Sequence, residues 1–559
     1  MELNKFLSKK SLLIITLFFI FLFFRLFIDN SSVLSGSDNL KYMHAAKNFP
    51  NHTLYNDQLY LMHPPGYPYA IYIFTLIFGD DYLAAVMISL ISSVISFFVL
   101  YRFFMVITNN FKLTFFVMIF FTLSVGFITA SRVALRESFI IMLIITSIYY
   151  FTKWVKFYDK KSLIFSTIIS SILAITSDHV IFIFPALALS YLFFNKEKVD
   201  IMKFHFPNIS YIIILLIIVG SLYGAWTTIK FYQYSQYEYY PNGYEGTPIH
   251  ITHLGLLQAI NPQFFDDFHG TRFTDSNFIS LLKRLVFNFG YMFNIQPLSI
   301  PEGLNFTTAK FLLLPKHVSY IVLIYLPLVI IALYGIYAIF RNLIKTRNLY
   351  NNFNLYFTLL FLLFAFPVTQ QLASPRYILP AYIFFFYFVS YGLIALFEEK
   401  FKLKLHFKAL SIVTIVLLLL IPIWYAQNNF VVLTADRIIS ASNTGRYIVN
   451  NLPKDAGIMA QPGYNVKLIY QTQNRMIGLY PKPERLGEII EIFNISYIVV
   501  GRYYTYDAYH LAQDSVEYVQ GNPDKFELIA KIDEDYTKFF VKGDPARTDE
   551  IYIYKVREN

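Results

Sequence analysis

Long apolar runs separated by short polar loops fill the first 430 residues. A helix of about 20 apolar residues is long enough to cross a bilayer. The pattern therefore predicts a polytopic α-helical membrane protein with about eleven transmembrane helices, at 11–28, 82–107, 113–129, 138–151, 162–176, 180–194, 211–226, 318–340, 353–369, 377–397 and 410–425.

The basic residues alternate between the loops in a way that predicts the orientation of the chain. Short loops on one side carry few basic residues, whereas loops on the other side carry Lys5, Lys9, Lys10, Arg102, Lys112, Lys153, Lys156, Lys160, Lys161, Lys196, Lys198, Lys203, Arg341, Lys345, Arg347, Lys400, Lys402, Lys404 and Lys408. Positive loops stay in the cytoplasm. We therefore expect a cytoplasmic N-terminus in an integral cell-membrane protein, with loops 29–81 and 227–317 and the C-terminal region outside.

One apolar segment, Tyr67–Phe78, is too short to span comfortably. Counting it as a span would also move every later basic loop to the outside. We therefore predict a helix that lies in the outer membrane interface, with Tyr67, Tyr69 and Tyr72 at headgroup depth. Phe278–Phe293 in the second long outer loop is a similar amphipathic candidate.

The hydropathy falls after about residue 430, and the pattern becomes that of a soluble domain. We expect the chain to divide into a membrane part, 1–430, and a small extracytoplasmic α/β domain, 431–559. Its predicted helices are 436–451 and 483–493, and its predicted strands are 457–460, 476–479, 495–501, 526–532 and 551–556.

Composition narrows the possible functions. The chain is 56% hydrophobic and 15% charged, with a mean hydropathy of +0.48. A net charge of +10 would suggest nucleic acid in a soluble protein, but here the basic residues orient the spans, and we expect no nucleic-acid partner. The chain contains no cysteine, which excludes disulfides and cysteine-bound metals. We predict no cofactor and leave a divalent metal open.

The first candidate for chemistry is Asp38, about ten residues beyond the first span, with His44 nearby as a further candidate. Partial desolvation at the bilayer edge raises the basicity of a carboxylate, which suits a general base. The alternative is an ordinary loop aspartate. Twenty-odd residues later, His63 precedes the turn Pro64-Pro65-Gly66-Tyr67-Pro68, whose prolines restrict the backbone. His63 and Tyr67 could contact a phosphate or a sugar, or the turn could simply lead into the interfacial helix.

Three arginines fall at outward span ends. Arg132 and Arg136 are four residues apart and would share a helix face, with Glu137 beside them, and Arg376-Tyr377 opens a later span. Guanidinium groups recognise phosphate well, although either arginine could instead snorkel to lipid headgroups. Asp178 and His179 lie in an outward turn, Ser177-Asp178-His179, that we interpret mainly as structural and only secondarily as bordering a site. Arg25 lies near a span end and is assigned no role.

In their order and sidedness these motifs resemble the GT-C superfamily of integral-membrane glycosyltransferases. The resemblance is to the branch with protein O-mannosyltransferases and bacterial aminoarabinose transferases. It rests on Asp38, Pro64–Pro68, Arg136-Glu137-Ser138, Arg376–Pro380 and the outer C-terminal domain. The Trp-Trp-Asp motif of the oligosaccharyltransferase branch is absent, since the tryptophans are Trp154, Trp226 and Trp424. Relatives often carry an acidic pair where this chain has Asp38-Asn39, and some have Lys where it has His63.

The resemblance implies an inverting glycosyltransferase that uses a polyprenyl-phosphate-linked sugar, with Asp38 as the base. Its acceptor would be a glycan, lipid or protein at the outer face, and membrane lipids would surround it. Two other hypotheses stay open: a polytopic transporter or lipid flippase, and an inactive relative that acts in assembly.

Overall fold

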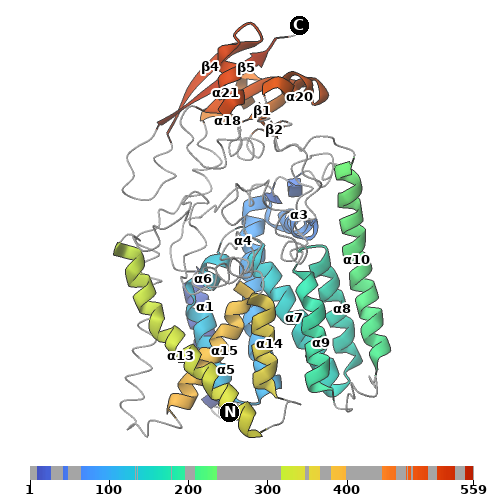
Figure 1. Ribbon diagram of the computed structural model, residues 1–559, viewed down its shortest axis with the longest axis vertical. Helices are drawn as coiled ribbons and strands as arrows, with labels where there is room; N and C mark the ends of the chain where they lie inside the picture. The colour runs from blue at the N-terminus through green and yellow to red at the C-terminus, as the bar shows by residue number, and fades with distance from the viewer. Residues whose placement is uncertain are drawn as a thin grey trace, which may run out of the picture.

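The structure is a computed structural model, and it shows a helical body with a small β-sheet at one end (Figure 1). It describes residues 9–26, 42–43, 45–47, 64–132, 134, 136–177, 179–195, 208–235, 316–346, 352–365, 379–397, 443–460, 472, 474, 476–479, 483–501, 513–535 and 548–557.

The apolar runs form the helices of the body. Polar residues start several of them: the Asp80 carboxylate accepts a hydrogen bond from the Leu83 amide at 2.6 Å, and the Asn110 side chain accepts one from Leu113 at 3.1 Å. The helices are α1 Lys9–Leu26, α3 Gly66–Phe78, α4 Asp81–Thr108, α5 Phe111–Leu123, α6 Val125–Ala130, α7 Glu137–Phe157, α8 Lys160–Ala174, α9 Val180–Phe194, α10 Ile209–Ser235, α13 Lys316–Thr346, α14 Phe353–Ala365 and α15 Leu379–Ala395.

The helices lie where the sequence predicts spans, with one break. Each predicted run except 410–425, which falls outside the described residues, coincides with a helix, but the run 113–129 is divided at Ser124. Among the described residues, Asp81–Thr108, Glu137–Phe157 and Ile209–Thr228 are long and apolar enough to cross a membrane. The mostly helical membrane architecture is thus confirmed, and the number of spans stays a prediction.

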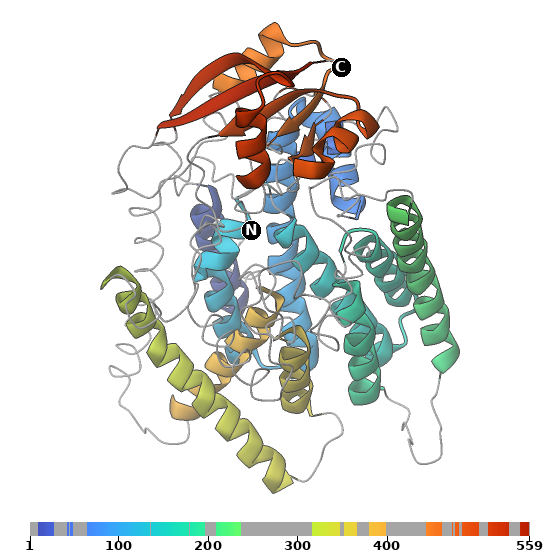
Figure 2. The ribbon, with the colours of Figure 1, turned by 45° about the horizontal axis from the view of Figure 1, so that its top comes forward.

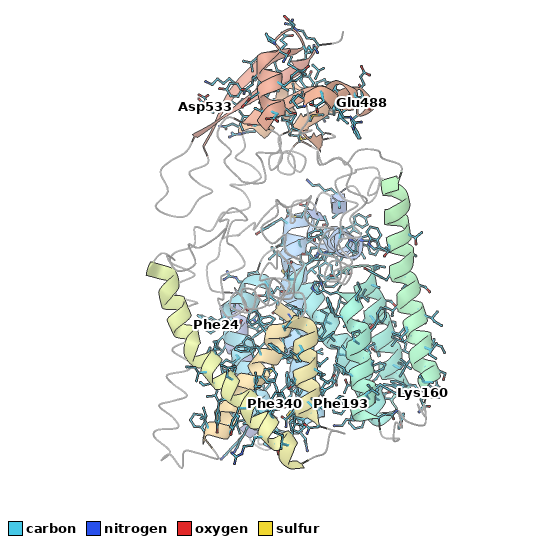
Figure 3. All side chains as sticks on the ribbon, in the orientation of Figure 1. Phe24, Lys160, Phe193, Phe340, Glu488 and Asp533 are labelled. Carbon is cyan, nitrogen blue, oxygen red and sulfur yellow. The ribbon has the colours of Figure 1, made fainter. Side chains whose placement is uncertain are left out.

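The fold brings several of the predicted basic positions to one end of the helical body (Figure 3). There, the Lys10 ammonium lies 5.6 Å from the Phe111 ring, and Lys156 donates a hydrogen bond to the Val106 carbonyl at 2.6 Å. Figure 3 shows Lys160 at this end and the C-terminal sheet at the opposite end, where Asp533 of a strand and Glu488 of a helix beside the sheet are labelled. Lys10, Lys156 and Lys160 therefore lie at the end of the body away from the sheet.

Helix α3 has the predicted extent, but its first tyrosine packs against protein and does not face the headgroups. Tyr67 is fully buried, which corrects the prediction that its ring anchors the helix in the interface. The helix packs on α4 through Tyr67 and Ile71, while Tyr69, Leu76 and Ile77 are exposed on its other side. An exposed apolar face suits a lipid boundary, so the interfacial location of the helix stays a prediction.

Residues 443–557 form a five-stranded mixed sheet with the order β2-β1-β3-β5-β4. Its strands are β1 Gly457–Ala460, β2 Met476–Gly478, β3 Ile495–Gly501, β4 Phe526–Asp535 and β5 Thr548–Val556. β1 is parallel to β2 and β3, whereas β5 is antiparallel to β3 and β4. The five strands coincide with the segments predicted as strands.

The helices around the sheet are α18 Asn443–Asn451, the 3₁₀ turn η10 Pro483–Arg485, α20 Leu486–Ile492 and α21 Gln513–Gly521. The first three match predicted helices, although 436–442 lies outside the described residues. Helix α21 was not predicted from the sequence, because it is short and largely polar. Figure 2 shows the sheet over the end of the body that contains α3.

Candidate functional site

The candidate site lies at the sheet-side end of the helical body. Three sequence motifs that are far apart in the chain meet there: the Pro64–Pro68 turn, the start of α7, and the turn between α8 and α9. Part of the first outward loop, Tyr42 to Lys47, lies against them.

Gly66 attaches the proline-rich turn to the turn that follows α8. Its amide donates a hydrogen bond to the Ile175 carbonyl at 2.7 Å. A Cβ atom at Gly66 would lie 2.4 Å from Thr176 Oγ1 and 2.7 Å from the Ile175 oxygen, so the approach leaves no space for a side chain. Pro64 and Pro68 are also buried. The rigid turn therefore begins α3 at a fixed place.

The turn after α8 holds its own shape through Ser177 and His179. Ser177 Oγ lies 2.8 Å from His179 Nδ1, and it also accepts a hydrogen bond from the His179 amide at 3.3 Å. These contacts agree with the mainly structural role expected for the turn. His179 nevertheless comes to the same end of the body as Gly66.

Tyr67 is the centre of the aromatic packing in the site. Its ring contacts Tyr42 edge-on, with centroids 5.2 Å apart, and lies 6.0 Å from Phe139 of α7. Burial raises the pKa of the Tyr67 hydroxyl, with Glu137 adding to that effect and Ser89 and Arg136 opposing it. The phenol is therefore a neutral hydrogen-bond donor at physiological pH.

Arg136 and Glu137 mark the start of α7. Arg136 has the N-cap position, and its guanidinium carbon lies 5.5 Å from the centroid of the Tyr42 ring. Glu137 is buried in the first turn, where the helix dipole favours a carboxylate. An arginine beside a helix N-terminus is an electropositive arrangement suited to an anion such as phosphate.

Arg132 is not on one helix face with Arg136, as the sequence had suggested. The chain leaves helix α5 at Ser124, forms the short helix α6, and then passes through Ser131, Arg132 and Arg136 outside any helix. The expected four-residue helical spacing is wrong because α7 begins only at Glu137. Arg132 and Arg136 are both half-buried at the same end of the body.

No role was predicted for Arg25, but the structure places it in the same region. It is buried in α1, with its Nε donating a hydrogen bond to Ser93 Oγ at 3.0 Å. Its other nitrogens donate to the carbonyls of Phe121 and Thr122 at 3.4 and 3.3 Å, next to the break at Ser124. Its guanidinium carbon lies 3.6 Å from the Phe21 ring centroid, and its charge interacts with that of Arg132.

Arg25 thus binds the carbonyl groups that the end of α5 leaves without helical partners. It fixes the chain just before the segment that carries Arg132. The one available sequence signal was an arginine inside an apolar run, which is rare in membrane helices and usually faces protein.

Asp38, His44, His63, Asp178, Arg376 and Tyr377 lie outside the described residues. Their predicted roles stay predictions. The described part of the chain contains no group of three or more His, Asp or Glu that could hold a metal ion. Because Asp38, His44, His63 and Asp178 fall outside that part, metal dependence also stays a prediction.

The part of the chain that forms the candidate site also matches a known protein family. Residues 62–223 match the model of a family described as dolichyl-phosphate-mannose-protein mannosyltransferase, under a third of the chain. The matched part runs from the proline-rich turn to α10 and includes Arg132, Arg136, Glu137 and His179. The chain resembles the GT-C glycosyltransferases. The family resemblance expected from the motifs is confirmed.

A solved structure shares the fold of this GT-C-like chain. It is the archaeal oligosaccharyltransferase AglB from Archaeoglobus fulgidus, in complex with an inhibitory peptide and a dolichol-phosphate. The TM-score is 0.53 at 12% identity, over 88% of this chain and 69% of AglB. At 12% identity the likeness concerns the fold alone. It does not decide between the oligosaccharyltransferase branch and the predicted mannosyltransferase and aminoarabinose transferase branch.

Two further structures were compared with the GT-C-like chain. ArnT from Cupriavidus metallidurans bound to undecaprenyl phosphate has a TM-score of 0.42 at 10% identity, over 97% of each chain. The arabinofuranosyltransferase AftD from Mycobacteria has a TM-score of 0.48 at 12% identity, over 99% of this chain and 40% of AftD. A search of the curated proteins gives no match.

Proposed function

We propose that the chain is an inverting glycosyltransferase that moves a sugar from a polyprenyl-phosphate-linked donor to an acceptor at the outer membrane face. One observation carries this proposal: the stretch that matches the mannosyltransferase family folds so that Tyr67, Arg132, Arg136 and Glu137 come to one end of the helical body. The donor class agrees with the polyprenyl phosphates bound to AglB and ArnT.

In the proposed reaction, Asp38 removes the proton from an acceptor hydroxyl. The acceptor oxygen then forms a bond to the anomeric carbon while the bond between that carbon and the phosphate oxygen breaks. The polyprenyl phosphate leaves with the electron pair, and the proton remains on Asp38 until solvent takes it. A single displacement inverts the anomeric centre, and one carboxylate is enough because a phosphate leaves without being protonated.

The developing charge on the leaving phosphate would be stabilised by cations at this end of the body. Arg136 is suited to that role, since it lies at the N-terminus of a 21-residue helix and packs over the Tyr42 ring. Arg132, Arg376 and His63 are proposed to act with it, and Tyr377 to border the donor. Tyr67 and Glu137 would then order Arg136 and its surroundings, with His44, Asp178 and His179 as further candidates.

No metal is part of the proposed step, because arginines can neutralise the phosphate. Treatment with a chelator should therefore leave transfer unchanged. The proposed orientation places the N-terminus in the cytoplasm and the C-terminal α/β domain, 431–559, outside. The acceptor would be a glycan, lipid or protein.

A transporter or lipid flippase would share the membrane architecture but would return the donor lipid with its sugar attached. An inactive relative would bind the donor without transfer. Native mass spectrometry of the purified protein, before and after an acceptor extract is added, separates these functions. A transferase should carry a polyprenyl-phosphate sugar that loses its sugar mass to an acceptor. A bound donor that persists unchanged would contradict the proposal.

A further inference from the structure

The C-terminal sheet has two buried faces, and adjacent residues of β3 belong to different ones. Val500 packs in a cluster with Ile489 of α20 and Val516 and Val519 of α21. Val499 packs in a second cluster, with Ile458 of β1 and Ile553 of β5. Both valines are fully buried. Successive side chains of a strand point to opposite faces, so each face needs its own cover.

The second face is covered by two elements from distant parts of the sequence. Helix α18 contributes Ile448, and the residue Leu452 follows it. The other contribution is Ala45 from the first outward loop, which is 3% exposed and belongs to the same cluster. A residue of the membrane part therefore completes the core of the C-terminal sheet.

The segment that carries Ala45 has a second packed side. Tyr42 and Ala46 lie in a cluster with Tyr67, Ile71 and the start of α4. Tyr42 also contacts the Tyr67 ring and lies beneath the Arg136 guanidinium. Tyr42, Ala45 and Ala46 thus connect the sheet on one side with the candidate site on the other.

We propose that the C-terminal sheet, through Ala45, positions the first-loop segment that carries Asp38. The inference rests on the proposed function for the role of Asp38. Asp38 is four residues before Tyr42, and four residues of extended chain span at most about 14 Å. Fixing Tyr42 therefore restricts the region that the carboxylate can reach. Ala45 is a positioning residue in this account.

The size of residue 45 gives a way to disturb this contact. A larger side chain at a filled, buried position forces its surroundings apart. Ala45→Leu should push the 42–47 segment away from the sheet, whereas Ala45→Ser should be tolerated. A displacement of about 1 Å in a reacting group can lower turnover about a hundredfold, so even a small shift of the loop should be measurable.

The absence of cysteine from the sequence allows single-thiol measurements on the full chain. In nanodiscs, the thiol of Ala45→Cys should react with a maleimide at least about tenfold more slowly than that of Lys47→Cys, since only the second position is exposed. Equal rates would overturn the docking contact. This measurement needs no donor and no activity, so it is independent of the proposed function.

A nitroxide attached to Asp38→Cys then tests positioning. Its mobility should increase when Ala45→Leu or Val499→Ala is added, because both changes disturb the covered face. Val500→Ala removes the same two methyl groups from the opposite face of the same strand, and it should leave the nitroxide unchanged. Equal mobility in the Val499→Ala and Val500→Ala backgrounds would overturn the proposal, because the sheet would then act only through its stability.

Kinetics link the contact to the reaction. Ala45→Leu and Val499→Ala should lower kcat by about tenfold or more, with the dissociation constant for the donor lipid unchanged. Val500→Ala and Ala45→Ser should keep the wild-type kcat. An unchanged kcat in Ala45→Leu, alongside a mobile nitroxide, would overturn the positioning role. A wild-type protein that transfers no sugar would refute the proposed function, while the labelling and nitroxide results would still decide how the sheet holds the loop.

Discussion

The amide of Gly66 donates a hydrogen bond to the carbonyl of Ile175 across 2.7 Å, joining the proline-rich turn to the turn between α8 and α9. The two residues are more than a hundred positions apart. The contact places Tyr67 against Phe139 and Tyr42. One backbone hydrogen bond thus helps to bring the first loop, α3 and α7 into one site.

Gly66→Ala should destabilise the protein. The added carbon would overlap Thr176 Oγ1 and the Ile175 oxygen, and the turn would have to move. We expect a loss of about 1–3 kcal/mol, measured by thermal unfolding in detergent. In Gly220→Ala, the matched control, the added carbon meets no atom within 4 Å, so helix α10 should gain up to about 1 kcal/mol. Wild-type stability in Gly66→Ala would show that the close approach is not required.

Arg25→Lys should also destabilise the fold. The lysine ammonium is a single point donor and does not reproduce hydrogen bonds to Ser93, Phe121 and Thr122 from one planar group. Leaving buried acceptors unsatisfied should cost about 1–3 kcal/mol in the same unfolding assay. Arg102→Lys, at an exposed position near the other end of the body, should change stability by less than about 0.5 kcal/mol. Equal losses of stability in Arg25→Lys and Arg102→Lys would show that the Arg25 hydrogen bonds do not stabilise the fold.

The sequence predicted the helices well because a membrane span has a strong, simple signal. Strands such as 457–460 and 495–501 were also predictable, since short buried runs bounded by polar residues favour strands. The break at Ser124 was not, because the apolar run continues through it and the Arg25 side chain that binds the Phe121 and Thr122 carbonyls comes from a distant helix. Arg132 and Arg136 do not share a helix face because α7 begins only at Glu137.

Within the candidate site, sequence spacing identified the motifs but not their contacts. Nothing local indicates that Gly66 meets Ile175, or that Ala45 packs into the core of the C-terminal sheet. Tyr67 was expected at the lipid interface because an aromatic residue in an apolar helix has the same pattern whether lipid or protein surrounds it. Burial of that kind depends on which helices become neighbours.

The orientation of the chain can be tested with reporters in the loops. Lys10, Lys156 and Lys160 lie at one end of the helical body and the C-terminal sheet at the other (Figure 3). Reporters at Asn110, Lys160 and Asn348 should be cytoplasmic, and reporters at Asn242 and the C-terminus should be outside. Membrane-impermeant labelling of single thiols provides the measurement. Finding Lys160 and the C-terminus on the same side would contradict the orientation.

Arg136→Ala and Arg376→Ala should weaken use of the donor while leaving the protein folded. The reason is the loss of a guanidinium that would pair with the donor phosphate, at least about tenfold in kcat/KM. Arg136→Lys should restore only part of the activity, because it lacks the fork geometry. Arg102→Ala, near the opposite end, is the control. Unchanged donor kinetics in both alanine variants would indicate that these arginines only contact lipid headgroups.

Asp38→Asn is the most direct test of the proposed function. The substitution keeps the shape of the side chain and removes its basicity, so it separates chemistry from packing. Sugar transfer from a polyprenyl-phosphate donor should fall about a hundredfold or more. Binding of the donor lipid, followed in the same preparation by native mass spectrometry, should persist because cations elsewhere hold the phosphate. Near-normal transfer by Asp38→Asn would contradict the account, and the base would have to be sought elsewhere, first at Glu137 or Asp178.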